Sequence, residues 1–174
     1  MDTAHNTGLY FRGTGVLSFD RFDSDGLPQG LRDLGNALNF TLGVPIEKKE
    51  HTSFRDEAPT VDMEMTTRRK LTGKFTLDEY DVENLRMYLS GVEDTFSIAP
   101  LTAESIEGQL DFVGANDQGI KFHVQVWKVK LFPSGDLTFI GDDWGQIPFE
   151  FTVVADTVGH PNSPYGLITP IGES

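Results

Sequence analysis

Residues 72–91 read TGKFTLDEYDVENLRMYLSG and contain the clearest change of pattern in the chain, from a strand into a helix. Asp78 has the character of a helix N-cap, because its carboxylate can accept hydrogen bonds from the free backbone N–H groups of a first turn. Gly91 stands where a residue of left-handed conformation would end the helix. We therefore predict one helix over about residues 78–90.

This helix is expected to bury one of its sides. Its apolar residues recur every three or four positions, the spacing that places side chains on one face: Val82, Leu85, Tyr88 and Leu89. Polar residues share the opposite side, where Glu83 can pair with Arg86: Glu79, Glu83, Arg86 and Ser90. Nearly all of the remaining chain has the pattern of strands and turns, so the helix should lie across a sheet and cover one of its faces.

Alternating apolar residues predict strands on both sides of the helix, and hence a mainly β fold. The last of them, 147–153, alternates strictly. The longest, 120–132, changes phase at Val126 and Trp127, which predicts a bulge or a strand whose two faces are buried at different ends. The predicted strands span residues 8–20 (interrupted by Gly13-Thr14-Gly15), 36–43, 60–67, 71–77, 95–100, 107–113, 120–132, 137–141 and 147–153.

The composition fits one folded domain over residues 1–174. Hydrophobic residues make up 38% of the chain and 13 residues are Phe, so a packed core is expected. No run of about 18 apolar residues is present, so we expect neither a transmembrane helix nor a membrane partner. The first residues, MDTAHNTGLYF, lack the basic and apolar regions of a Sec-type signal peptide. The chain has no cysteine, which excludes disulfides and thiol chemistry and suggests folding in a reducing cytoplasm.

The net charge of −13 is uneven along the chain. Residues 1–90 carry 15 acidic and 11 basic residues, and residues 91–174 carry 12 acidic and 3 basic ones. This distribution offers no basic face for gripping nucleic acid. It fits an acidic surface that promotes solubility, or a surface that must let a polyanion pass without binding it.

Three segments are expected to extend from the β domain. Residues 1–7 form a polar arm, and residues 47–59, EKKEHTSFRDEAP, form a mobile loop or an exposed hairpin around the isolated Phe54. Residues 159–174 contain three prolines and are expected to form an extended arm. Its apolar tip, formed by Tyr165, Leu167 and Ile168, suits docking on a neighbour better than packing on its own domain.

The residues that usually carry chemistry form no catalytic, metal or cofactor pattern. Asp23-Ser24-Asp25-Gly26 is read as a turn, since the EF-hand register would place arginines at ligand positions. The adjacent carboxylates Asp142 and Asp143 point apart, so they are better suited to a turn than to a catalytic dyad. The histidines are scattered, and His123 is predicted to be a strand surface residue. We therefore predict that the protein is not an enzyme and has no cofactor.

Two stretches together resemble the major tail tube proteins of long-tailed (siphovirus-like) bacteriophages. Residues 34–91 are similar to the central part of that family, with a strand, a charged loop, two strands and a helix bearing Glu83-Asn84-Leu85. Residues 126–157, VWKVKLFPSGDLTFIGDDWGQIPFEFTVVADT, are similar in their two turns and in a final strand that ends in Ala-Asp before a Pro-rich tail. The resemblance covers roughly residues 34–170.

The resemblance implies a β-sandwich or barrel-like tail-tube fold with one flanking helix. Such subunits form hexameric rings that stack into a hollow tube around a tape-measure protein, alongside other tail proteins, and later around DNA that passes without specific binding. The protein would then be part of the virion tail, after a stage in the host cytoplasm. On this view the loop at 47–59 and both arms make the contacts between rings, and strand edges pair between subunits. The predicted interface residues are Lys48, Lys49, Phe54, Arg55, Arg68, Arg69, Tyr165, Leu167 and Ile168.

Two alternatives remain open. One is another tail component, such as a terminator, a distal tail protein or the inner tube of a contractile tail. The other is a free β-sandwich module that binds carbohydrate, which should present exposed aromatic side chains along a groove. Trp127 and Trp144 are instead predicted to lie in a strand and in a tight turn.

Overall fold

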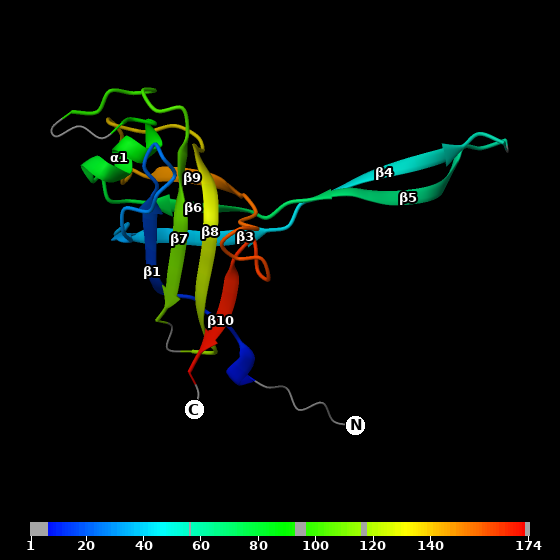
Figure 1. Cartoon of the computed structure of the whole chain (residues 1–174), viewed down its shortest axis with the longest axis horizontal. Helices are drawn as coiled ribbons and strands as arrows, with labels where there is room; N and C mark the ends of the chain where they lie inside the picture. The colour runs from blue at the N-terminus through cyan, green and yellow to red at the C-terminus, as the bar shows by residue number, and fades with distance from the viewer. Residues whose placement is uncertain (1–6, 56, 93–96, 116–117, 173–174) are drawn as a thin grey trace.

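Antiparallel strands form most of the structure, a computed structural model that describes residues 7–55, 57–92, 97–115 and 118–172 (Figure 1). A 3-10 turn, η1 (Thr7–Leu9), precedes them, and the single α-helix among these described residues is α1 (Val82–Tyr88). The strands are β1 (Gly15–Arg21), β2 (Arg32–Asp33), β3 (Ala37–Gly43), β4 (Ile46–Ser53), β5 (Thr60–Arg69), β6 (Thr72–Leu77), β7 (Ile106–Gly114), β8 (Lys121–Pro133), β9 (Ile147–Val153) and β10 (Leu167–Ile171).

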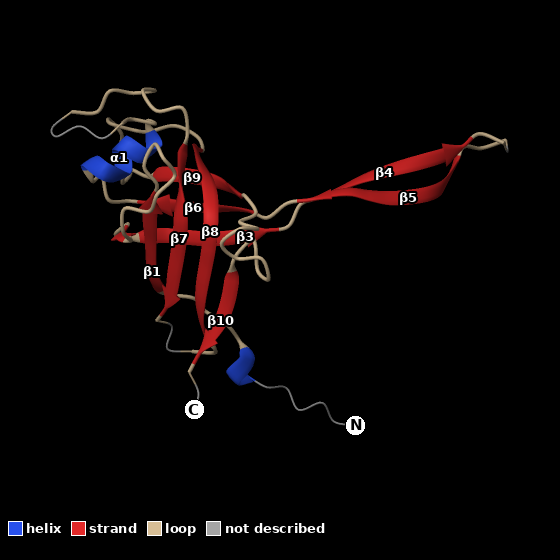
Figure 2. Ribbon diagram, viewed as in Figure 1, coloured by secondary structure: helices blue, strands red, loops and turns tan. Residues whose placement is uncertain are grey.

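Strand β8 joins the two layers of the main sheet. The order of the sheet is β2-β1-β7-β8-β9-β6-β3, with β10 as an additional partner of β8. One edge of β8 pairs with β7, while its other edge pairs first with β10 over Lys121–Gln125 and then with β9 over Val129–Pro133. Strands β1, β7 and β8 therefore run across β3, β6 and β9 (Figure 2). This β-sandwich-like arrangement with one flanking helix confirms the predicted fold class.

The core lies between these layers and is rich in phenylalanine. The predicted alternation of 147–153 is confirmed, since every second residue of β9 is buried, beginning with Ile147. The rings of Phe75 in β6 and Phe149 in β9 stack with centroids 4.9 Å apart. On the other layer Leu17, Phe19 and Leu110 are fully buried. Apolar faces from both layers thus close on one another, which supplies the main stabilising term of the fold.

The predicted irregularity in the longest strand is confirmed. Gly108 of β7 pairs with Val129 of β8, but Leu110 pairs with Val126, so β8 has one residue more than β7 over this interval. The extra residue falls at Trp127 and Lys128 and makes a bulge. It separates the half of β8 that pairs with β10 from the half that pairs with β9.

The helix is shorter than predicted, and its ends differ from the prediction. It begins after Asp81, not Asp78, and the Asp81 side chain makes no capping hydrogen bond. The Asp78 carboxylate instead accepts a hydrogen bond from the Asn36 side chain at 2.7 Å. At the other end the left-handed residue is Ser90, with φ of 51°, and not Gly91. The Gly91 N–H then reaches the carbonyl of Arg86 at 2.9 Å, as in a Schellman motif.

The buried side of the helix also differs from the predicted stripe. Val82 is half exposed, whereas the polar Asn84 and Arg86 are only 1% and 3% exposed. Asn84 is buried because its amide donates to the carbonyls of Leu34 and Glu79 at 3.1 and 3.2 Å. Arg86 pairs with Glu83, as predicted. A two-turn helix is placed by such polar contacts as much as by its apolar stripe.

Three predicted strands are absent or shorter. Residues 137–141 form a loop on α1, because the hydroxyls of Tyr88 and Tyr80 donate to the carbonyls of Gly135 and Thr138 at 2.5 and 2.9 Å. Residues 97–100 are not a strand, and 95–96 lie outside the described residues. Of the segment 8–20, only the part from Gly15 is in a strand. No helix among the described residues has the length and apolar character needed to cross a membrane.

Candidate assembly surfaces

A long hairpin of β4 and β5 projects from the sandwich (Figure 1). It emerges between β3 and β6 and forms a two-stranded sheet of its own, from the pair Ile46–Arg69 to the pair Ser53–Thr60. All residues of β5 and the first six of β4 are exposed. The predicted segment 47–59 is therefore most of β4 together with the tip of an exposed hairpin, and β5 forms the returning strand.

Ion pairs cross the hairpin from strand to strand. Lys48 contacts Glu64 at 2.5 Å and Lys70 contacts Glu47 at 3.1 Å, while a hydrogen bond of 2.6 Å joins His51 Nδ1 to the Asp62 carboxylate. The hydrogen bond and the charge of Glu64 raise the pKa of Lys48 above its ordinary value. In the part of the chain that the structure describes, four hairpin cations form no ion pair: Lys49, Arg55, Arg68 and Arg69.

Apolar side chains on the hairpin are open to solvent. Phe54 near its tip is 76% exposed, and Met63 and Met65 are more than half exposed opposite His51 and Lys49. In the predicted strand 60–67 these residues alternated as if one face were buried, but within one chain nothing covers that face. An isolated two-stranded hairpin has marginal stability in water. The hairpin is thus a surface with the composition of an interface.

The C-terminal segment packs on its own domain, contrary to the predicted free arm. Leu167 to Ile171 form β10, which pairs in register with Gln125 to Lys121 of β8. The first half of β8 would otherwise have an unpaired edge, and the C-terminal segment covers it. Tyr165, Leu167 and Ile168 remain about half exposed.

A cluster around Trp127 fixes the segment before β10. The indole of Trp127 stacks on the His160 ring at 3.8 Å between centroids, and its Nε1–H donates to the carbonyl of Ser163 at 2.8 Å. The Asp156 carboxylate contacts His160 Nδ1 at 2.8 Å. A hydrogen bond from the Gly159 N–H, together with His160, lowers the pKa of Asp156.

The predicted interface residues therefore fall on two separate elements. Lys48, Lys49, Phe54, Arg55, Arg68 and Arg69 lie on the hairpin. Tyr165, Leu167 and Ile168 lie at or on the edge strand β10. Of the predicted N-terminal arm, residues 1–6 lie outside the described residues and Thr7 begins η1. The two groups of predicted interface residues do not lie together in the structure.

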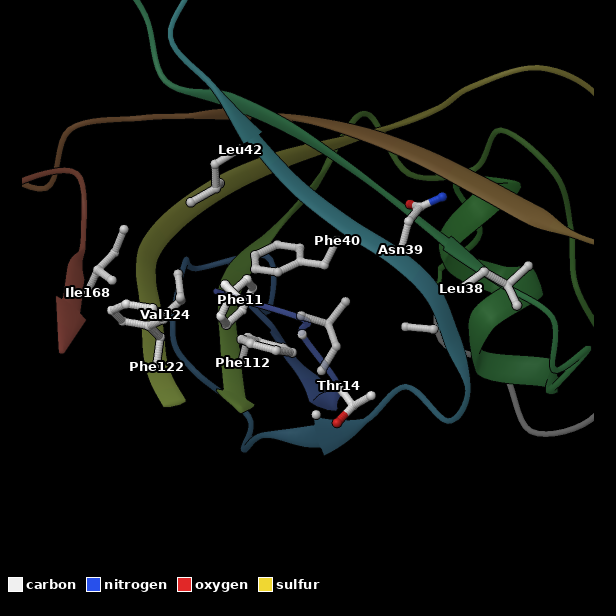
Figure 3. Close-up of a pocket in the computed structure, with 14 residues that line it drawn as sticks. Phe11, Thr14, Leu38, Asn39, Phe40, Leu42, Phe112, Phe122, Val124 and Ile168 are labelled. Carbon is white, nitrogen blue, oxygen red and sulfur yellow. The ribbon is translucent and has the colours of Figure 1, made fainter. Parts of the chain in front are cut away.

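Sequence reasoning missed an apolar hollow at the seam between the layers (Figure 3). It has a volume of about 350 Å³, and its walls come from β1, β3, β7, β8, β10 and the segment before β1. The lining residues are Phe11, Gly13, Thr14, Gly15, Leu17, Ala37, Leu38, Asn39, Phe40, Leu42, Phe112, Phe122, Val124 and Ile168. The only signal in the sequence was the pair of glycines at 13 and 15, which interrupt the first predicted strand.

A second missed surface is the loop that follows β8. Ile140 and Trp144 are 97% and 94% exposed, and Phe139 is also exposed although its ring lies 6.2 Å from that of Tyr80. This loop lies against α1, at the end of the sandwich away from the hairpin (Figure 1). Exposed apolar side chains thus occur in this loop as well as on the hairpin.

Charge is divided between the hairpin and the rest of the chain. Residues 46–70 hold six acidic and six basic residues, so the whole net charge of −13 belongs to the other residues. A neutral projection therefore extends from an acidic domain. Two such molecules can bring a hairpin to an acidic surface without the repulsion that two acidic surfaces would meet.

The described residues contain no group of three or more His, Asp or Glu side chains that could hold a metal ion. The predicted turn at Asp23 is confirmed, since its carboxylate accepts hydrogen bonds from the N–H groups of Asp25 and Leu27 at 2.9 Å. His123 lies on β8, as predicted, and contacts the largely buried Asp111 of β7 at 2.8 Å. These polar groups are paired within the fold and support its strands and turns.

No curated protein matches the chain. A family model described as "Protein of unknown function UCP028589" matches residues 10–110 and 92–169, which includes the sandwich, the hairpin and the start of β10. Because the two matched segments together cover most of the chain, the protein belongs to this family.

Proposed function

We propose that this chain is a structural virion protein, the major tail tube subunit of a long-tailed bacteriophage. Its copies would form hexameric rings that stack into a hollow tube around a tape-measure protein, with an acidic lumen through which DNA passes. The observation that carries the proposal is the β4–β5 hairpin, which projects from the sandwich with both faces open to solvent. The resemblance of residues 34–170 to tail tube proteins is the reason for proposing a tail tube as the assembly that the hairpin helps to form.

The hairpin supports self-association for an energetic reason. Its two strands carry exposed Phe54, Met63 and Met65, and a two-stranded hairpin gains little stability without a third strand or a packed face. Burying three such side chains against a partner contributes roughly 1.5–3 kcal/mol for each. A second copy of the chain is a partner that is always present at equal concentration.

Open strand edges offer the lateral contacts that a ring needs. Among the described strands, β3 pairs only with β6, and β10 only with β8, so each leaves one edge of backbone groups unpaired. Head-to-tail contacts between two different surfaces close into rings when the rotation fits. The edges of β3 and β10 are two such different surfaces.

The acidic charge supports passage of DNA through the assembly. With the net charge of −13 placed outside the hairpin, a tube of these subunits would present like charge to a phosphate backbone. DNA would then move through the lumen without being held. The same negative charge argues against a protein whose function is to bind DNA, because DNA binding needs basic residues that neutralise phosphates.

Two alternatives share part of this support. Another tail component would use the same sandwich and hairpin, and imaging of the assembled particle separates the two. A carbohydrate-binding module gains some support from the exposed Trp144 and Phe139, but Trp127 is engaged with His160 and Ser163. Binding of glycans by a chain that stays monomeric would favour the module.

Shortening the hairpin tests its role in assembly. Glu47 and Arg68 are paired across the base of the hairpin, so replacing residues 48–67 by Asn-Gly joins them through a two-residue turn. We expect a folded sandwich with an unchanged far-UV circular dichroism signature of β structure and no rings or tubes in negative-stain images. The sandwich should still fold, because none of the removed residues belongs to the hydrophobic core.

A matched control is Val158→Ser, which removes a 93% exposed apolar side chain outside both the hairpin and the loop of Ile140 and Trp144, and which should leave tube formation normal. Normal tubes from the shortened chain would contradict the role of the hairpin. If the unmodified chain formed no assembly at any concentration, the proposed function itself would be wrong.

A further inference from the structure

The hollow at the seam of the sandwich has the properties of a ligand site (Figure 3). It lies where the curled sheet stays open, with β3 on one side and β1, β7 and β8 on the other. Its volume of about 350 Å³ falls in the range of pockets that hold small molecules. It is separate from the hairpin, and no residue of the hairpin lines it.

Four phenylalanines from four segments form its walls in two contacting pairs. Phe11, before β1, lies edge-on to Phe122 of β8 at 5.7 Å between ring centroids. Phe40 of β3 lies 5.5 Å from Phe112 of β7. In Figure 3 the four rings lie near one another, below Leu42. Aromatic rings favour further aromatic neighbours in edge-to-face and offset arrangements.

The hollow carries no charge. None of its fourteen lining residues is acidic or basic, although charged residues make up 24% of the chain. The polar side chains are those of Thr14 and Asn39, and the Asn39 amide already donates to Thr76 at 3.3 Å. A charged group placed against these apolar walls would lose part of its hydration and gain no partner, so an uncharged molecule is favoured.

We propose that this hollow binds a small uncharged aromatic molecule. Apolar cavities of less than half this volume, lined by leucine, isoleucine and phenylalanine, stay dry and bind benzene. A ring placed beside the four phenylalanines restores the dispersion contacts that the open seam lacks.

The position of Phe11 favours a small molecule over an extended chain segment in the seam. Phe11 belongs to the segment that leads into β1, and its contact with Phe122 extends that segment across the hollow. A strand laid along the seam would have to separate these two rings. A small molecule fills the space beside them and leaves the contact in place.

Toluene is a suitable probe, and benzoate is its charged counterpart of similar size. We expect isotope-labelled, unassembled full-length chain to bind toluene at one saturable site, with nuclear Overhauser contacts from toluene to the methyl groups of Leu42, Val124 and Ile168. Benzoate should bind at least about tenfold more weakly, because its carboxylate must lose hydration.

Filling variants test the location from two different walls. Leu42→Phe on β3 and Val124→Phe on β8 should each weaken toluene binding at least about tenfold, while Ile140→Phe, at a fully exposed position, should leave it unchanged. If a filling variant fails to fold, the nuclear Overhauser contacts of toluene measured on the unmodified chain still show whether toluene binds in the hollow.

Three results would overturn the proposal: no saturable binding of toluene, equal binding of benzoate, or contacts that map to Trp144 and Phe139. A fourth would be a signal from a second copy of the chain in the hollow that disappears on dilution. The test does not depend on assembly, so its failure would leave the proposed function standing.

Discussion

At the scale of single residues, Trp127 was predicted only as a strand residue, but in the structure it also holds the segment before β10. It stands at the bulge of β8, stacks on His160 and donates a hydrogen bond to Ser163. The segment that it holds leads directly into β10. One side chain on the central strand thereby anchors the C-terminal part of the chain to the sandwich.

Replacing Trp127 by Phe should loosen this anchor without opening the core. The variant keeps an aromatic ring beside His160 but loses the indole N–H, so we expect a cost of about 1 kcal/mol in the free energy of unfolding. Amide hydrogen exchange of Leu167 to Ile171 should become faster, while that of β6 and β9 stays unchanged. Unaltered exchange in β10 would contradict the anchoring role.

Glu107 on β7 sets a second residue-scale expectation, concerning pH. Burial alone would raise the pKa of Glu107, but the hydrogen bonds and charges of Lys130 and Lys128 outweigh burial and lower it overall. The lysine Nζ atoms lie 3.0 and 3.6 Å from its carboxylate. A pKa that is lower in the folded chain stabilises the fold above the ordinary value of 4.5, and this contribution is lost as the pH falls through the folded pKa.

Glu107→Gln should therefore flatten the fall in stability below pH 4.5. Urea unfolding at a series of pH values would show the free energy of unfolding of the unmodified chain falling more steeply in that window than that of the variant. Glu57→Gln, at an exposed hairpin position, is the matched control. If the free energy of unfolding fell equally steeply with pH for Glu107→Gln and the unmodified chain, the lysine contacts would not stabilise the ionised Glu107.

At the scale of elements, the end of α1 depends on a non-glycine residue in left-handed conformation. Ser90 has φ of 51°, while the following Gly91 closes the Schellman hydrogen bond to Arg86. A non-glycine residue in this region costs on the order of 1 kcal/mol. The sequence placed the glycine one position away from where the backbone needs it.

Ser90→Gly should stabilise the chain by about 0.5–1 kcal/mol, since it relieves this conformation. Chemical denaturation measures the change directly. Gly91→Ala is the informative comparison, because an added Cβ would meet Arg86 Cγ at 3.1 Å and Ile98 Cγ2 at 3.3 Å. A loss of stability for Ser90→Gly, as for a glycine placed inside a helix, would instead place the left-handed residue at Gly91, where the sequence alone suggested it.

Local patterns predicted well those elements whose faces pack within one chain. The alternation of 147–153 and the phase change at Trp127 both correspond to packed or paired neighbours in the structure. Residues 47–59 were predicted as a mobile loop or an exposed hairpin, and 60–67 as a separate strand. The pairing of the two into one hairpin was not predicted, since alternation at Met63 and Met65 normally indicates a buried face and these residues are exposed.

Long-range pairing explains the errors. Residues 159–174 were expected to form an extended arm because they contain three prolines, yet β8 has an edge that β10 covers. Residues 137–141 have the composition of a strand, but hydrogen bonds from Tyr80 and Tyr88 hold them as a loop. The seam hollow depends on β3, β7, β8 and β10 meeting β1 and the segment before it, which no local pattern contains.

At the scale of the whole molecule, the structure has two unlike ends. A neutral hairpin with exposed apolar side chains extends from one end, and the acidic sandwich presents Ile140 and Trp144 at the other. Unlike surfaces favour head-to-tail association, which closes into rings or continues into stacks. Salt should promote this association, because it screens the repulsion between domains that share the charge of −13.

Negative-stain microscopy of the purified, full-length chain over a range of concentrations tests this account most directly, with light scattering to give the mass in solution. The account predicts six-fold rings or hollow tubes of uniform diameter, more abundant as protein concentration and salt increase. A chain that remains a monomer at every concentration and salt level would contradict it.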